Sequence, residues 1–143
     1  MPVRATRILI ADDHEVMRRG VRSLLEAKPE WEICGEAADG REAVAQVVAL
    51  KPDLVVLDLT MPVLNGLHAA KEIRRISPGT KIVIFTLHDS AHVATEARGA
   101  GADAVVVKSA PAERLVETIE RLVAQPAFDE VSVVRTGTRQ NSR

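Results

Sequence analysis

The stretch that decides the fold is DLVVLDLTMP, residues 53–62. It contains the apolar run LVVL, continues to Asp58, and then turns the chain at Met61-Pro62. A short apolar run closed by a turn signal is typical of a strand buried on both faces of a parallel sheet. Asp58 then lies at the carboxyl end of that strand, where an unpaired carboxylate is costly. The stretch therefore predicts that other groups converge on Asp58.

Four further apolar runs repeat this pattern, and segments with helical spacing of apolar residues separate them. The predicted strands are residues 8–11, 31–37, 54–57, 81–86 and 104–107. Helices follow them, with Asp39 as a capping residue, Gly66 near a helix start and Pro111 in the first turn of the last helix. Strands and helices that alternate at steps of roughly 20–25 residues predict an α/β protein with a doubly wound parallel sheet.

The composition fits one domain that needs no covalent cross-link. A chain of 143 residues buries enough surface for a core, and its single cysteine, Cys34, fits a reducing compartment. The 19 basic and 20 acidic side chains nearly cancel, which gives no argument for nucleic acid or membrane as the main partner. No membrane span or signal peptide is recognisable. We expect a cytoplasmic protein with one domain over residues 6–124 and a tail or linker over residues 125–143.

Residues with reactive side chains stand at the ends of four predicted strands. They are Asp12 and Asp13 after the first strand, Asp58 after the third, Thr86 at the end of the fourth and Lys108 after the fifth. Ligands of open α/β sheets bind outside the carboxyl ends of the strands, and neighbouring strands are about 4.8 Å apart. Three acids in one pocket repel one another unless a cation neutralises them. Carboxylate oxygens suit Mg²⁺, which also keeps waters and a phosphate oxygen.

This arrangement predicts phosphoryl chemistry at Asp58. A carboxylate can attack phosphorus to give an aspartyl phosphate, and such a transfer needs mainly positioning and charge neutralisation. Mg²⁺ would bridge Asp13, Asp58 and the phosphoryl group. Lys108 would pair with one phosphoryl oxygen, and the Thr86 hydroxyl would donate to another. The hydroxyl contact exists only after phosphorylation, so it can move a loop.

The motifs at these strand ends resemble the receiver domain of bacterial two-component response regulators. They are ADDH (11–14), LDLTMPVLNG (57–66), FT (85–86) and VVVK (105–108). The resemblance covers about residues 6–124 and implies a flavodoxin-like (βα)5 fold with strand order 2-1-3-4-5. It also implies a sensor histidine kinase or a phosphotransfer protein as the phosphoryl donor.

The family's roles fall on particular residues of this chain. The resemblance implies the Mg²⁺ ligands Asp12, Asp13, Asp58 and the main-chain carbonyl of Thr60, the phosphoacceptor Asp58, and the responding residues Thr86 and Lys108. It implies no enzyme activity beyond self-catalysed phosphorylation and dephosphorylation. Output would pass through the face formed by residues 88–123, to a protein partner or a homodimer.

The longer pattern, from ADDHEVMRRGVRSLLE to DLVVLDLTMPVLNGLHAAKEIRR, is similar to receivers that precede a helix-turn-helix domain in regulators of the LuxR type. No recognition-helix pattern and no basic stripe follow residue 125. Three alternatives therefore stay open: a stand-alone receiver, the receiver part of a DNA-binding regulator, and a pseudo-receiver that acts by constitutive protein binding. In each of them we expect this chain itself to bind neither nucleic acid nor membrane.

Two residues depart from the family pattern. Val105 stands three residues before Lys108, where receivers of the chemotaxis type carry an aromatic that swings inward. A valine has no ring to rotate, so aromatic switching in its usual form is not expected. Ser109 follows Lys108 where many receivers have a proline in a cis peptide bond. The usual cis proline is therefore absent.

Two other protein classes share some of these features but fit the chain less well. A phosphatase of the haloacid dehalogenase type needs a second Asp two residues after the nucleophile, where Thr60 stands, and a cap domain. A flavodoxin-like flavin carrier needs a phosphate loop after the first strand and stacking aromatics. This chain has Asp-Asp-His there, and one Trp, two Phe and no Tyr in total. Its histidines, at positions 14, 68, 88 and 92, are scattered and are predicted to be surface or loop residues rather than zinc ligands.

Overall fold

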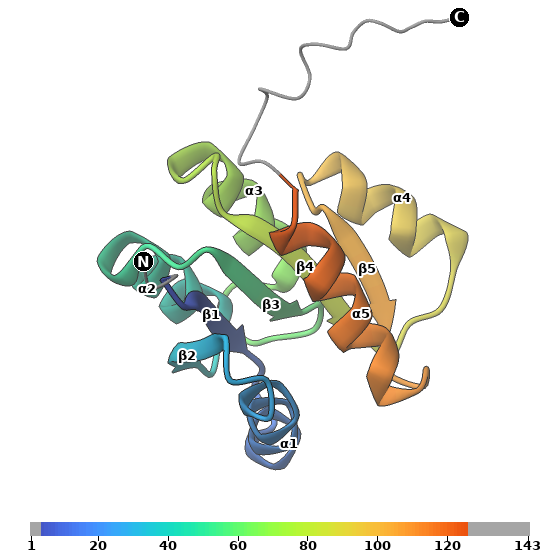
Figure 1. The fold of residues 1–143 in the computed structure, drawn as a ribbon. Helices are drawn as coiled ribbons and strands as arrows, with labels where there is room; N and C mark the ends of the chain where they lie inside the picture. The colour runs from blue at the N-terminus through green and yellow to red at the C-terminus, as the bar shows by residue number, and fades with distance from the viewer. Residues whose placement is uncertain (1–3, 126–143) are drawn as a thin grey trace, which may run out of the picture.

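The computed structural model describes residues 4–125, in which five strands alternate with five helices (Figure 1). The strands are β1 (Thr6–Ala11), β2 (Trp31–Ala37), β3 (Leu54–Asp58), β4 (Lys81–Thr86) and β5 (Ala104–Val107). The helices are α1 (Glu15–Glu26), α2 (Gly40–Leu50), α3 (Gly66–Ile76), α4 (Ala91–Gly99) and α5 (Ala112–Val123). Every predicted strand and helix is present. The predicted tail lies, from residue 126 onward, outside the described residues.

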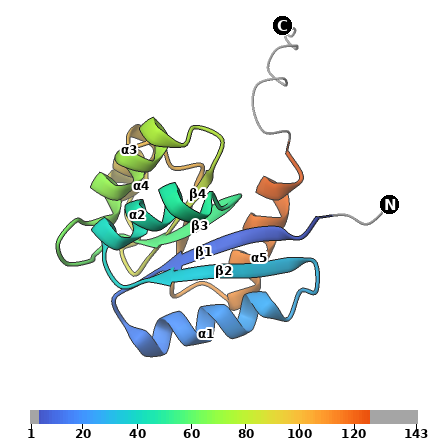
Figure 2. The same ribbon diagram turned by 90° about the vertical axis from the view of Figure 1, so that its left-hand side faces the viewer.

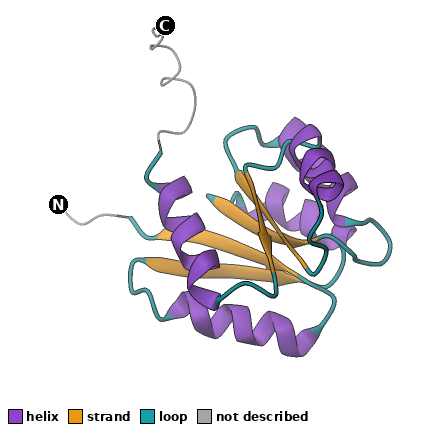
Figure 3. Cartoon of the chain, turned by 90° about the vertical axis from the view of Figure 1, so that its right-hand side faces the viewer, coloured by secondary structure: helices purple, strands orange, loops and turns teal. Residues whose placement is uncertain are grey.

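The five strands form one parallel sheet in the order β2-β1-β3-β4-β5, which confirms the flavodoxin-like topology. Helices α1 and α5 cover one face, and α2, α3 and α4 cover the other (Figures 2 and 3). The helix after β1, α1, packs on one face of the sheet, and the helix before β3, α2, packs on the other. The topological switch point therefore lies between β1 and β3. Ligands of such sheets bind there, outside the carboxyl ends of the strands.

Strand β3 is buried on both faces, as its continuous apolar run predicts. Its side chains alternate: Val55 and Leu57 join the core beneath α2, α3 and α4, whereas Leu54 and Val56 join the core beneath α1 and α5. All five residues of the strand are buried, including Asp58. Each buried Val or Leu stabilises the fold by roughly 1.5–3 kcal/mol relative to an exposed one. This apolar strand therefore holds Asp58 at a defined place between two helical layers.

The helix starts follow local capping chemistry. The Asp39 carboxylate accepts a hydrogen bond from the Glu42 main-chain N–H at 2.8 Å, which confirms the predicted cap of α2. Asn65 and Ser90 cap α3 and α4 in the same way. Pro111 lies at the N-cap, one residue before α5, rather than inside its first turn as predicted. A proline lacks the N–H that a helix start leaves unpaired, so both positions tolerate it.

The loop after Asp58 folds back tightly onto β3. The Gly66 N–H donates to the Leu59 carbonyl at 2.8 Å, and a Cβ at Gly66 would lie 2.2 Å from the Asp58 carbonyl oxygen. Only glycine permits this approach, so Gly66 determines where α3 begins relative to Asp58. Val63, within the same loop, has a φ of 70°, in the left-handed region. None of the helices within residues 4–125 has the length and apolar character of a membrane span.

Candidate phosphoacceptor and metal site

The predicted site residues meet at the carboxyl edge of the sheet. The Lys108 ammonium lies 2.9 Å from Asp12 Oδ2 and 3.2 Å from Asp58 Oδ1. Thr60, Thr86, Lys108 and Asp58 line one cavity of about 210 Å³. The ion triad therefore comes from the residues directly after β1 and β5 and from the last residue of β3, and β4 supplies a hydroxyl beside it.

All three members of this triad are buried. Asp12 and Asp58 are 3% and 5% exposed, and the Lys108 side chain is 4% exposed. Asp13 differs, because its side chain keeps 31% of its surface exposed. Buried charges require partners, and here one ammonium serves two buried carboxylates. The site therefore carries an excess of negative charge before Asp13 is counted.

The pKa of Asp58 is raised above its ordinary value. Burial is the main cause, and the nearby Asp12 carboxylate adds to it, while Lys108 acts in the opposite direction. Ligand atoms of Asp12, Asp13, His14 and Asp58 lie within 4.8 Å of one another. Carboxylate oxygens at this spacing fit a hard divalent cation, which would offset the repulsion among them.

The two acids of the Asp12-Asp13 pair differ in their contacts. The Asp12 amide donates to the Ala37 carbonyl at 3.0 Å, and its two carboxylate oxygens accept from the His14 amide at 2.8 Å and from Lys108 at 2.9 Å. The Asp13 carboxylate is partly exposed, and His14 Nδ1 lies 3.2 Å from its Oδ1. Hydrogen bonds within the protein therefore hold Asp12 in place, whereas Asp13 is the more accessible ligand for a cation.

Thr86 keeps a hydroxyl proton available. Its Oγ1 accepts a hydrogen bond from the His88 main-chain N–H at 3.0 Å, and within residues 4–125 its own O–H donates no hydrogen bond. The residue is 1% exposed. The Thr86 carbonyl accepts from the Lys108 amide at 2.6 Å, which ties the ends of β4 and β5 together. Thr86 therefore contacts both the loop after β4 and the main chain of Lys108.

His14 was predicted to be a surface or loop residue, and the structure adds that it borders the site. Its side chain is 71% exposed, yet Nδ1 lies 3.2 Å from Asp13 Oδ1 and 3.4 Å from Asp12 Oδ1. Its adjacency to the acid pair in the sequence was the only available signal. Among residues 4–125 there is no cis peptide bond, so the bond from Lys108 to Ser109 is trans.

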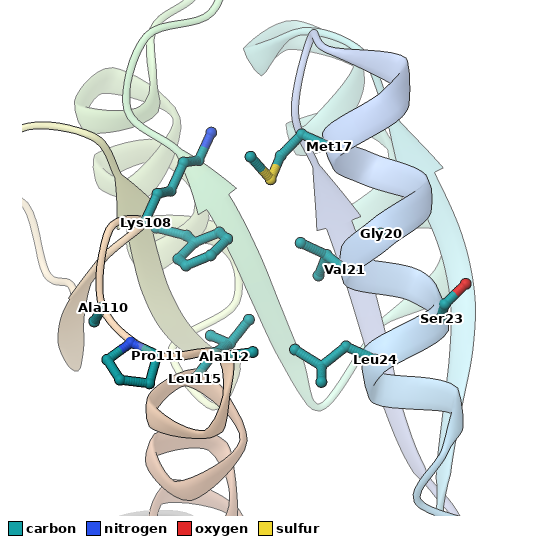
Figure 4. Close-up of a pocket in the computed structure, with 11 residues that line it drawn as sticks. Met17, Gly20, Val21, Ser23, Leu24, Lys108, Ala110, Pro111, Ala112 and Leu115 are labelled. Atoms are coloured by element: carbon teal, nitrogen blue, oxygen red, sulfur yellow. The ribbon is translucent and has the colours of Figure 1, made fainter.

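A larger groove of about 530 Å³ lies between α1 and α5, beside the acid site (Figure 4). Its lining is mostly apolar, with Met17 and Leu24 on α1, Leu115 on α5 and Phe85 on β4. Lys108 borders both this groove and the smaller cavity, and its ammonium lies 5.7 Å from the centroid of the Phe85 ring. The Lys108 side chain therefore lines both the groove and the smaller cavity.

A flavodoxin-like sheet with a lysine-bridged cluster of acids at its carboxyl edge defines an α/β domain with a polar site at the topological switch point. The family model of the response regulator receiver domain matches residues 8–120, and the chain belongs to this family. This assignment selects the receiver over the phosphatase and the flavin carrier. The chain is thus a receiver domain of the kind used in two-component signalling, a family whose members are in general not enzymes.

Individual relatives differ in how much of their own length this chain covers. The chain is 40% identical to the chemotaxis protein CheY of Thermotoga maritima over 81% of this chain and 96% of that protein. It is 33% identical to the transcriptional regulatory protein DegU of Brevibacillus brevis over 83% of this chain, but spans only 50% of DegU. The similarity to regulators that are longer than this chain agrees with the longer sequence pattern.

Solved structures agree with this assignment. A LuxR-family response regulator from Aurantimonas superposes with a TM-score of 0.81 at 39% identity, over 84% of this chain and 86% of that one. The receiver domain of NarL from Mycobacterium tuberculosis gives a TM-score of 0.82 at 26% identity, over 87% of this chain and all of that one. The predicted resemblance to receivers of the LuxR type is confirmed.

Proposed function

We propose that this receiver accepts a phosphoryl group on Asp58 in a Mg²⁺-dependent reaction and thereby switches a protein-binding face. The observation that carries the proposal is the position of the Lys108 ammonium between Asp12 and Asp58, at 2.9 and 3.2 Å. A buried carboxylate with a raised pKa, beside a lysine and two further acids, is typical of a functional site rather than of a structural ion pair.

The proposed Mg²⁺ ligands are Asp13, Asp58 and the main-chain carbonyl of Thr60, with Asp12 completing the acidic site. When bound, the cation neutralises the carboxylates and the charge on the transferring phosphoryl group. The exposure of Asp13 supports its part in this set, because a cation can reach it from solvent. Thr60 lines the same cavity as Asp58, which supports its assignment.

In the proposed reaction an Asp58 carboxylate oxygen attacks phosphorus, and the bond from phosphorus to the donor breaks. The donor is a phosphohistidine of a sensor kinase or phosphotransfer protein in the cytoplasm. Lys108 exchanges its contact with Asp58 for a contact with a phosphoryl oxygen. Water later hydrolyses the aspartyl phosphate. The protein thus catalyses only its own modification and its reversal.

The proposed switch begins at Thr86, whose free hydroxyl proton turns to a phosphoryl oxygen. Because its carbonyl holds the Lys108 amide and its Oγ1 holds the His88 amide, the ends of β4 and β5 shift together. Val105 replaces the usual aromatic, so the shift reaches the α4-β5-α5 face through the main chain. That face binds an output protein or a second copy. Phosphorylation changes the populations of two conformations rather than creating a new one.

We further propose that residues 6–124 are the receiver unit and residues 125–143 a tail or linker, and that this chain itself contacts no DNA. Output by a DNA-binding domain in a longer regulator is the alternative that the partial coverage of DegU supports. Output by protein contact is the alternative that the nearly complete coverage of CheY supports.

The test is an intact-mass spectrum after incubation with acetyl phosphate and Mg²⁺. The wild type gains one phosphoryl group, which is lost on hydroxylamine treatment, and Asp58→Ala gains none. Asp89→Ala, which removes an exposed acid from the loop after β4, is the matched control and keeps the adduct. A wild type that forms neither the adduct nor a beryllofluoride complex would act instead as a pseudo-receiver.

A further inference from the structure

Arg18, on the first half of α1, bridges the ends of two neighbouring strands. Its Nη1 donates to the Asp12 main-chain carbonyl at 2.6 Å, and its Nε donates to Glu36 Oε1 at 2.8 Å. We call these two contacts the Arg18 bridge. The Arg18 side chain is only 17% exposed, so its guanidinium is held in place rather than free in solvent.

The far end of the Arg18 bridge is itself immobilised. Arg22 Nη1 holds the second Glu36 carboxylate oxygen at 2.5 Å, and the Gln46 side-chain amide donates to the Glu36 carbonyl at 2.6 Å. Hydrogen bonds from Arg18 and then Arg22 lower the pKa of Glu36, so this carboxylate stays ionised. Glu36 therefore gives Arg18 a fixed anchor at the end of β2.

The other contact of the Arg18 bridge is to the peptide that links Asp12 to Asp13. The Asp12 amide is fixed by the Ala37 carbonyl at 3.0 Å, and the Asp12 carbonyl is fixed by Arg18. Because a peptide unit is planar, a fixed carbonyl also sets the direction of the following N–Cα bond. The Asp13 side chain is partly exposed, and its ion-pair partner His14 is itself 71% exposed, so the backbone is the main constraint on the direction of the Asp13 carboxylate.

We infer that Arg18 is a positioning residue for the metal site, which acts through the Asp12–Asp13 peptide to hold the Asp13 carboxylate toward Asp58 before a cation binds. The inference rests on the proposed Mg²⁺ site and deepens it. Partners that orient metal ligands typically change metal affinity by about 10–100-fold when they are removed. Removal of the Arg18 bridge is expected to weaken Mg²⁺ binding by about tenfold, the lower end of that range.

Arg22 offers a matched control on the same helix. It binds the same Glu36 carboxylate, and it also pairs with Glu26 at 2.9 Å, but within residues 4–125 it makes no hydrogen bond or ion pair with Asp12. A purely structural role in holding α1 against β2 is shared by Arg18 and Arg22. Only Arg18 combines that role with the contact to the acid pair.

The experiment is calorimetric titration of Mg²⁺ into the wild type, Arg18→Met and Arg22→Met, with thermal unfolding followed by circular dichroism in parallel. Arg18→Met is expected to raise the Mg²⁺ dissociation constant about tenfold. Arg22→Met is expected to raise it by much less, because Gln46 still holds the Glu36 carbonyl and Arg18 keeps its contact with the Asp12 carbonyl. Arg18→Lys, which keeps a cationic donor for the Asp12 carbonyl, is expected to recover part of the affinity.

Each outcome either supports or overturns the inference about Arg18. Equal Mg²⁺ affinities in the wild type and Arg18→Met overturn the inference, and so do equal losses in Arg18→Met and Arg22→Met. If Arg18→Met does not fold, Arg18→Gln carries the same expectation, because its shorter side chain keeps polarity but does not span the bridge. A wild type that binds no Mg²⁺ contradicts the proposed metal site itself, which is a separate failure.

Discussion

Strand β3 has an aspartate on either side of its apolar run, and the two carboxylates differ in their surroundings. Asp53 precedes the strand and binds the Arg4 guanidinium at 2.8 and 3.0 Å and the Arg7 amide at 2.8 Å. Burial alone would raise the pKa of Asp53, but these hydrogen bonds lower it below its ordinary value. Asp58 ends the strand and shares one lysine with Asp12, and its pKa is raised.

The contrast separates a structural carboxylate from the proposed phosphoacceptor. Asp53 has donors on both oxygens and needs nothing more from solvent or ligand. Asp58 lies among other acids and shares one lysine with Asp12, so its ionised form is only partly compensated until a cation binds. Proteins accept such local cost at functional sites and offset it by the rest of the fold.

The largest expected effect comes from neutralising the two acids in turn. Asp58→Asn removes the nucleophile, so phosphorylation by acetyl phosphate falls to zero, as measured by intact mass. Asp53→Asn leaves the carboxyl edge of the sheet intact, and the adduct forms as in the wild type. Loss of the adduct in Asp53→Asn would show that the two ends of β3 are not independent.

Removing the shared lysine tests how much the buried triad depends on it. Lys108→Met leaves Asp12 and Asp58 buried without a cationic partner, and the free energy of unfolding is expected to fall by about 3 kcal/mol. Added Mg²⁺ recovers part of this loss, because it binds the folded state. Urea unfolding with and without Mg²⁺ measures both effects. A loss no larger than that of the exposed-site control Lys71→Met contradicts the expectation.

The structural acid has a smaller stability effect. Asp53→Asn weakens charge-assisted hydrogen bonds to a partly exposed carboxylate, and the free energy of unfolding is expected to fall by about 1 kcal/mol. Asp58→Asn in metal-free buffer removes repulsion instead, so its unfolding free energy is expected to equal or exceed that of the wild type. The comparison is made by urea unfolding in EDTA. A destabilised Asp58→Asn would mean that the Lys108 contact outweighs the repulsion.

The smallest effect is a difference in pH dependence. A raised folded-state pKa means that folded Asp58 holds its proton where unfolded Asp58 has lost it, so its contribution to stability declines as pH rises above 3.8. A lowered pKa has the opposite sign, so the contribution of Asp53 declines as pH falls below 3.8.

Unfolding free energies measured across acid pH in EDTA test this difference. Relative to Asp58→Asn, the wild type should lose stability as pH rises from 3.8 through the raised pKa. Relative to Asp53→Asn, it should lose stability as pH falls below 3.8. Parallel pH curves for the wild type and both variants would contradict the assigned directions.

The sequence predicted the strands and the site residues because both depend on local signals. The run at 54–57 has no polar side to expose, so burial on both faces was the only stable use of it. Asp12, Asp13, Asp58, Thr86 and Lys108 were found because strand ends of a parallel sheet meet at one edge. The position of Pro111 was wrong by one residue, since its lack of an N–H suits either place.

By itself the sequence determined the parallel sheet and the set of side chains at its carboxyl edge, because hydrophobic pattern and strand polarity are local properties. Only the tertiary structure decided which atoms meet. Lys108 contacts Asp12 across 96 positions of the chain, and Arg18 reaches Glu36 and the Asp12 carbonyl. The tertiary structure also decided that the pKa of Asp53 is lowered and that of Asp58 is raised. Charge interactions depend on distances and burial that arise only when distant segments pack together.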